Sequence, residues 1–140
     1  MKNSKKLFLI FLSVLIVAFV SCKKDSGGSI TTPTPTFKPS SLVGTWKNGD
    51  AHNFTVGEGN ITSIKINNVT ATKTITIDTW KEDKDKDVSE YTQSLTKQQI
   101  GQHTYDFVFT FKSASSCVAT ITEDSGAPQS FTLTKQPTTK

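Results

Sequence analysis

The sequence predicts an all-β domain, built as an antiparallel up-and-down meander of about eight short strands that closes into a small barrel or stacks as a β-sandwich. Residues 42–135 are rich in β-branched and aromatic side chains, and no segment there has a convincing helical period. Polar turns that contain Gly, Asn or Asp recur at short intervals. Between several of these turns apolar and polar residues alternate, so that a strand has one face for a core and one for water.

The expected strands follow one another in chain order with short polar breaks between them. Their ranges are 42–47, 52–56, 61–66, 70–81, 88–95, 103–112, 117–122 and 130–135. The breaks contain NGD, GEGN, NN, KEDKDKD, QQIGQ, SASS and DSGAP, and connections of this length join antiparallel neighbours. Residues 96–99, TKQQ, have room for one helical turn at most.

The first five strands rest on β-forming residues that lie between turn signals. LVGTWK, HNFTV and ITSIKI are short runs with aromatic or β-branched residues. In the longer fourth strand, Ile75 and Ile77 alternate with threonines. The fifth strand, residues 88–95, begins where the charged KEDKDKD break ends.

Alternation is clearest in the sixth strand, HTYDFVFTFK at 103–112. Tyr105, Phe107, Phe109 and Phe111 share one face of it. An eight-stranded barrel is just wide enough for such rings either to line a pocket for a small hydrophobic ligand or to fill the interior. Because a small domain needs every buried ring for stability, we rank a filled core ahead of a pocket.

The last two strands show the same period of two. Cys117 shares a face with Ala119 and Ile121, and Phe131 and Leu133 alternate with polar residues. We interpret Cys117 as a small buried apolar side chain, because no motif marks it as a catalytic thiol.

The first residues have the layout of a secretory signal. Residues 1–6 carry three lysines, and residues 7–20 are apolar apart from Ser13. This apolar run is too short for a membrane-spanning helix, which needs about 20 residues. We expect residues 1–21 to be a cleaved signal peptide.

The residues around Cys22 resemble the cleavage site of bacterial lipoproteins. Ser21 precedes the cysteine, and SCKKD is similar to the start of many Bacteroidetes lipoproteins. The resemblance implies that the Cys22 sulfur carries diacylglycerol, that cleavage precedes it, and that its new amino group is acylated, for example with palmitate. It also implies anchoring in the cell envelope, with Lys23 after the cysteine favouring the outer membrane. The membrane face stays open.

Composition divides the rest of the chain. Residues 22–41 contain the lipidated cysteine and a Gly-, Ser-, Thr- and Pro-rich tether, residues 42–135 are the β domain, and residues 136–140 are a disordered tail. Removing the three leader lysines from sixteen leaves thirteen, against twelve acidic residues, so the mature net charge is +1. The chain has no arginine, and no basic field suggests nucleic acid as a partner.

The segment SLVGTWK suggests a family. Gly44, Thr45 and Trp46 resemble the Gly-X-Trp signature of the first lipocalin strand, and FTLTKQ at 131–136 is similar to the last strand of lipocalin-like domains in Bacteroidetes lipoproteins. The resemblance implies a small lipocalin-like barrel in which Trp46 closes one end and Gly44 allows close approach of a neighbour. Lipocalins pack an arginine over this tryptophan, and here Lys112 or Lys135 would take that place.

No metal or catalytic motif stands out. The DKDKD segment at 83–87 lacks the Gly and Glu of a calcium-binding loop, and neither His52 nor His103 has a metal-type partner nearby in sequence. We therefore expect no enzyme activity, no cofactor and no metal.

Two functions remain open from the sequence. The first is an envelope-anchored, lipocalin-like lipoprotein that binds a small hydrophobic ligand. The second is a non-catalytic interaction module that binds a protein or a glycan through its outer β surface, with Trp80 and Tyr91 as candidate contacts.

Overall fold

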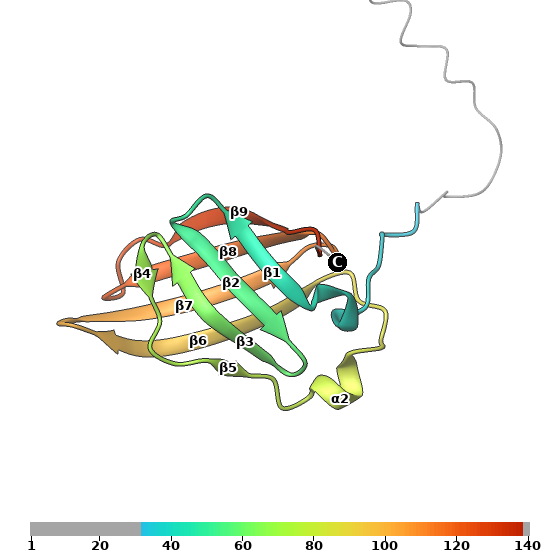
Figure 1. Cartoon of the computed structure of the whole chain (residues 1–140), viewed down its shortest axis with the longest axis horizontal. Coiled ribbons are helices and arrows are strands. Elements are labelled where there is room, and N and C mark those ends of the chain that lie inside the picture. Colours follow the sequence, from blue (N-terminus) through green and yellow to red (C-terminus); the bar gives the residue numbers. More distant parts are fainter. Residues whose placement is uncertain (1–31, 139–140) are drawn as a thin grey trace, which may run out of the picture. The chain divides into compact units, whose positions relative to one another are not determined.

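The computed structural model describes residues 32–138, and Figure 1 shows that this part is built almost entirely of strands. The predicted all-β class is therefore confirmed. Within the described range no helix has the length and apolar character needed to span a membrane. The elements are η2 (Pro39–Leu42), β1 (Gly44–Asn48), β2 (His52–Gly57), β3 (Asn60–Ile66), β4 (Val69–Thr70), β5 (Ile75–Thr76), α2 (Trp80–Asp83), β6 (Tyr91–Ile100), β7 (His103–Phe111), β8 (Ser116–Glu123) and β9 (Gln129–Lys135).

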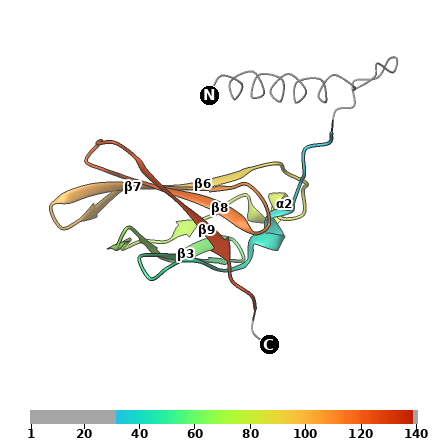
Figure 2. The same cartoon turned by 90° about the horizontal axis from the view of Figure 1, so that it is seen from above.

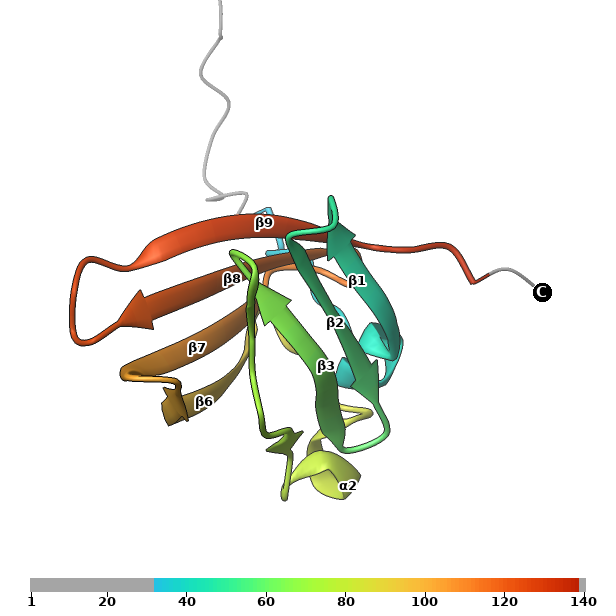
Figure 3. The same ribbon diagram turned by 60° about the vertical axis from the view of Figure 1, so that its left-hand side comes forward.

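The strands form one curled antiparallel sheet made of two meanders. The spatial order is β4-β3-β2-β1-β9-β8-β7-β6, with β5 pairing β3. The two meanders meet where β1 pairs β9, at Trp46 opposite Lys135 and Lys47 opposite Thr134. Figures 2 and 3 show that the sheet curls until β6–β8 lie across from β1–β3. Across residues 32–138 no strand ladder joins β6 to β4 or β5, so the sheet is a half-barrel.

The two halves of the sheet enclose an aromatic core. β7 alternates as predicted, with Tyr105, Phe107, Phe109 and Phe111 buried. Phe109 packs against Phe54 of β2, with ring centroids 4.6 Å apart, and so links the two meanders. The rings are offset or tilted, the arrangement that aromatic pairs prefer. The core thus sits inside the curl of the sheet.

The expected fourth strand, residues 70–81, is wrong as a single element. The chain instead forms two short strands, β4 and β5, and then the single turn α2. Ile75 and Ile77 still point inward, as their alternation predicted. The strand ends there because Trp80 turns back, with its N–H donating to the Ile77 carbonyl at 3.1 Å, and packs beside Gly59. Burial of the Trp80 ring is therefore favoured here over continued strand pairing.

The helical turn allowed at 96–99 is also absent. These residues belong to β6, whose pairing with β7 shifts register between Leu95 and Gln98. Lys97 has a φ of 54°, so the extra residue forms a bulge. The Lys97 N–H donates to a carboxylate oxygen of Asp106 at 2.6 Å, which compensates the missing ladder bond. β6 is therefore longer than predicted.

The folded body starts upstream of residue 42. Phe37 is buried and forms a two-bond bridge with Val88, each N–H lying 2.9 Å from the partner's carbonyl oxygen. Pro39 is buried in η2, which follows directly. At the other end, the Gln136 N–H donates to the Thr45 carbonyl at 2.8 Å. The last residues of the expected tether and the first of the expected tail thus contact the domain.

Candidate functional site

The interior of the half-barrel is filled. Phe107, Phe109 and Phe111 are at most 1% exposed. The hollow beside Tyr105 holds only about 30 Å³, lined by Asn67, Val69, Tyr105, Ile121, Glu123, Ala127 and Gln129. A site for a drug-sized ligand needs roughly 300–1,000 Å³, whereas one water needs about 10–15 Å³. The four-residue aromatic row therefore acts as core.

Gly44 and Trp46 belong to β1, the strand that pairs with β9 where the two meanders meet. The Trp46 indole N–H donates to the Leu42 carbonyl at 2.9 Å, and its ring stacks parallel to Phe54 with centroids 6.0 Å apart. Lys135 passes over Gly44, and its ammonium donates to the Ser41 carbonyl at 2.7 Å. Of the two expected lysines, Lys135 lies opposite Trp46, whereas Lys112 pairs with Glu90. The hydrogen bonds from Trp46 and Lys135 therefore hold residues 41–42 against β1 and β9.

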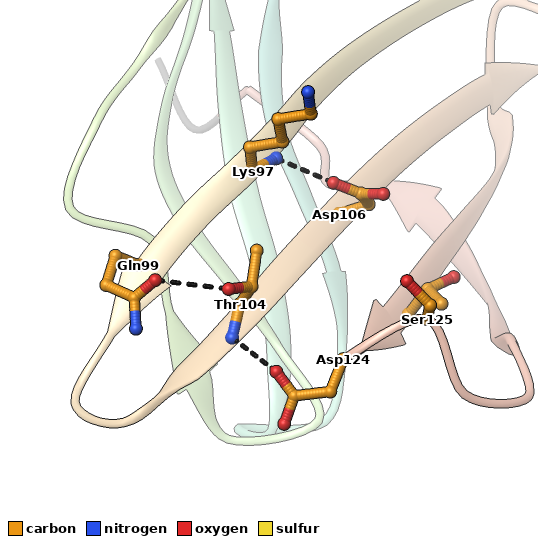
Figure 4. A pocket seen from close by; sticks show the side chains of 7 residues that line it. Lys97, Gln99, Thr104, Asp106, Asp124 and Ser125 are labelled. Carbon is orange, nitrogen blue, oxygen red and sulfur yellow. Dashed lines mark hydrogen bonds between the residues drawn. The ribbon is translucent and has the colours of Figure 1, made fainter.

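A large polar groove lies on the outer face of β6, β7 and β8. Its volume is about 520 Å³, and Figure 4 shows its lining side chains. The alternation that turns the β7 rings inward turns Thr104 and Asp106 outward. The lining comprises Lys97, Gln99, Thr104, Asp106, Thr122, Asp124 and Ser125. These lining residues carry hydroxyl, amide, carboxylate and ammonium groups, and none of them is aromatic.

Hydrogen bonds fix much of this lining (Figure 4). Asp106 holds the Lys97 bulge, and the Thr104 hydroxyl donates to the side-chain Oε1 of Gln99 at 3.1 Å. The Thr104 N–H donates to Asp124 Oδ1 at 2.8 Å. Within the described residues the Lys97 ammonium has no ion-pair partner. The groove therefore presents a fixed set of acceptors and one uncommitted cation.

A cluster of titratable groups borders the groove where β7 begins and β8 ends. His103 Nδ1 lies 2.6 Å from Asp124 Oδ2 and 3.0 Å from Glu123 Oε1. The hydrogen bond to Asp124 raises the pKa of the imidazole. The Thr104 N–H, and then His103, lower the pKa of the Asp124 carboxyl. All three side chains are exposed, and their ligand atoms lie within 4.8 Å of one another.

Local sequence patterns do not predict this cluster, because its members are far apart in the chain. Tyr105 pairs with Glu123 across β7 and β8, so the register alone brings His103 near Glu123 and Asp124. The only signal in the sequence is the acidic pair Glu123 and Asp124, which directly follows the expected strand 117–122 and so comes next to the strand that begins at His103. A register could not be assigned from those residues alone.

The remaining predicted positions have other surroundings. Trp80 is 6% exposed and Tyr91 is half-buried, so Trp80 cannot serve as an outer contact. His52 stacks on Phe131 and accepts a hydrogen bond from the Asn67 N–H at 3.0 Å, and its burial lowers its pKa. Cys117 is buried as expected, and burial raises the pKa of its thiol to about 12. Cys22 lies outside the described residues.

Comparison with protein-family models, curated proteins and solved structures gave no match to this chain.

Proposed function

We propose that this protein is a lipid-anchored lipoprotein of a bacterial cell envelope whose β domain is a non-catalytic glycan-binding module. The ligand site in this proposal is the outer groove of β6, β7 and β8. The observation that carries it is the contrast between a filled interior and a polar groove of about 520 Å³ on the outside. Of the two functions that the sequence left open, this contrast favours binding through the outer surface.

The size and lining of the groove favour a glycan over a protein partner. A stable protein interface covers about 800 Å² on each partner and is centred on apolar or aromatic anchors. The groove instead has the volume of a small-molecule site, and its lining offers hydrogen-bond donors and acceptors. Lys97 and Gln99 supply donors, and Asp106 and Thr122 supply acceptors, which together suit the hydroxyl groups of a sugar.

The anchor in this proposal rests on the sequence around Cys22. A basic leader, an apolar run and a small residue before the cysteine form the pattern of a lipoprotein signal. Mass spectrometry of the protein from native membranes tests it. We expect an N-terminal cysteine that carries a thioether-linked diacylglycerol and an amide-linked acyl chain. A free thiol on Cys22 or an uncut leader would refute the anchor.

Glycan binding is tested with the full chain purified in detergent and applied to an array of bacterial and host oligosaccharides. We expect saturable binding to a glycan, and a loss of at least about tenfold in affinity when Lys97→Asn and Thr122→Val remove two groove contacts. Asn tolerates the positive φ of residue 97, so this change leaves the bulge in place. Thr132→Val makes the same hydroxyl-to-methyl change on exposed β9, outside the groove, and serves as the matched control.

The hollow that residues 67–129 form beside Tyr105 holds about 30 Å³, which is too small for a fatty acid. A fluorescent fatty-acid probe should therefore show no saturable binding to the protein. Saturable binding that Phe107→Trp abolishes would instead assign the function to the interior. Failure of every glycan together with capture of one protein partner at the groove would favour the protein alternative.

A further inference from the structure

Two carboxylates lie close to one imidazole nitrogen where β7 begins and β8 ends. Asp124 Oδ2 and Glu123 Oε1 lie 2.6 Å and 3.0 Å from His103 Nδ1. One ring nitrogen carries at most one hydrogen, so it cannot give each carboxylate a full hydrogen bond. Even with His103 protonated, the three groups together have a formal charge of −1. Among residues 32–138 no lysine forms an ion pair with either carboxylate.

One member of this cluster is oriented before any ligand arrives. Asp124 Oδ1 accepts the Thr104 N–H at 2.8 Å, and the Asp124 N–H donates to the Thr104 carbonyl at 2.8 Å. The carboxylate is thus held by its second oxygen, while Oδ2 faces His103. Outer contacts of this kind orient the ligands of metal sites.

From this geometry we propose that His103, Glu123 and Asp124 form a binding site for a divalent transition-metal ion of the zinc class. The three ligand atoms lie within 4.8 Å of one another, and tetrahedral zinc with bonds near 2.0–2.1 Å places its ligands about 3.3 Å apart. Rotation of these exposed side chains can open the Nδ1–Oδ2 distance from 2.6 Å and the Nδ1–Oε1 distance from 3.0 Å to that spacing and so admit the ion. Binding replaces the Nδ1 proton, which leaves to solvent, by the metal, and the ring keeps its hydrogen on Nε2.

The donor set favours zinc-like ions over calcium and magnesium. Imidazole suits Zn²⁺, Co²⁺ and Ni²⁺, whereas Ca²⁺ takes six to eight oxygen ligands and Mg²⁺ keeps several waters around one or two carboxylates. Three protein ligands leave a fourth zinc position open. Asp124 also lines the outer groove, so this position borders a space of about 520 Å³. The metal proposal does not depend on glycan binding, because the ion contacts these three residues whether or not the groove is filled.

The test is isothermal titration of ZnCl₂ into the full chain, purified in detergent and stripped with EDTA. We expect saturable binding of about one ion per chain, and no saturable heat with CaCl₂. In a parallel NMR titration, the His103 ring and the Thr104 amide should shift together, while the His52 ring stays unchanged.

Substitutions separate a metal site from a simple ion pair. His103→Ala should abolish saturable Zn²⁺ binding, and Glu123→Gln should weaken it at least about tenfold. Glu123→Gln leaves the Asp124 turn intact, so it keeps the test valid if His103→Ala fails to fold. His52→Gln changes the other histidine and Asp50→Asn changes an exposed carboxylate paired with Lys47, and both should bind Zn²⁺ like the unaltered protein.

Three outcomes would overturn the proposal. They are no saturable Zn²⁺ binding to the stripped protein, unchanged binding after His103→Ala, or equal binding of Ca²⁺ and Zn²⁺. The last two would show that carboxylates hold the ion without the His103 imidazole. If the unaltered protein binds Zn²⁺ but no glycan, only the proposed glycan-binding function is refuted.

Discussion

At the scale of single residues, Gly44 combines an unusual backbone angle with a close neighbour. Its φ is 142°, a region that residues with a Cβ rarely enter, and an added Cβ would lie 2.9 Å from Lys135 Cε. Lys135 cannot simply withdraw, because its ammonium is bonded to the Ser41 carbonyl. The segment Gly44-Thr45-Trp46 therefore needs glycine at its first position for a steric reason.

We predict that Gly44→Ala lowers the free energy of unfolding by about 1–3 kcal/mol, the usual cost of a residue held in a disfavoured backbone region. Gly49→Ala is the control. Gly49 has a φ of 64° but nothing within 4 Å of an added Cβ, so it should cost less. Urea unfolding followed by tryptophan fluorescence measures both. Equal stability of the Gly44→Ala and unaltered proteins would show that the contact relaxes freely.

Cys117 gives a second residue-scale prediction, which concerns ionisation. Burial raises its pKa to about 12, so almost no thiolate forms at neutral or mildly alkaline pH. Iodoacetamide should leave Cys117 unlabelled at pH 8 in the folded protein and label it fully in urea. The slow labelling of the folded protein should rise about tenfold with each pH unit and level off only near pH 12. Rapid labelling of the native protein at pH 8 would mean that β8 opens readily.

At the scale of elements, the bulge in β6 is held from the neighbouring strand. The Asp106 carboxylate accepts the Lys97 N–H, and the same two residues line the outer groove. The bulge therefore bends β6 where it borders the groove.

We predict that Asp106→Ala lowers the free energy of unfolding by about 0.5–1.5 kcal/mol, as expected for one lost hydrogen bond at an exposed position. The local effect should be larger than the global one, because Lys97 loses the acceptor for its N–H. Hydrogen exchange of the Lys97 amide should accelerate, with Thr110→Ala on the same face of β7 as control. Unchanged exchange at Lys97 would show that the bulge persists without the carboxylate.

Elements with a clear period of two could be predicted from the sequence, and those fixed by tertiary contacts could not. The face of β7 that carries Phe107 and Phe109 was predicted because alternation reports burial directly. The region around Trp80 was mispredicted because its β-forming residues give no sign that the ring folds back beside Gly59. His103 met its carboxylate partners only through the β7–β8 register, which local patterns do not encode.

At the scale of the whole molecule, two meanders are joined by a short seam and a shared core. β1 and β9 pair at two positions only, and β6 has no ladder to β4 or β5 within residues 32–138. Packing across the curl must therefore supply much of the cohesion. Phe54 contributes most visibly, because its ring contacts Trp46 in its own meander and Phe109 and Phe111 in the other.

This arrangement predicts that the two meanders unfold together. Phe54→Ala should lower the free energy of unfolding by about 3–5 kcal/mol, the range for removal of a buried ring. Hydrogen exchange should rise in β7 and β8 as much as in β1–β3, because the lost contacts link both halves. Phe131→Ala is the control, since that ring is only partly buried and stacks on His52, and it should cost less. Selective loosening of β1–β3 in Phe54→Ala would mean that β6–β9 form a stable unit on their own.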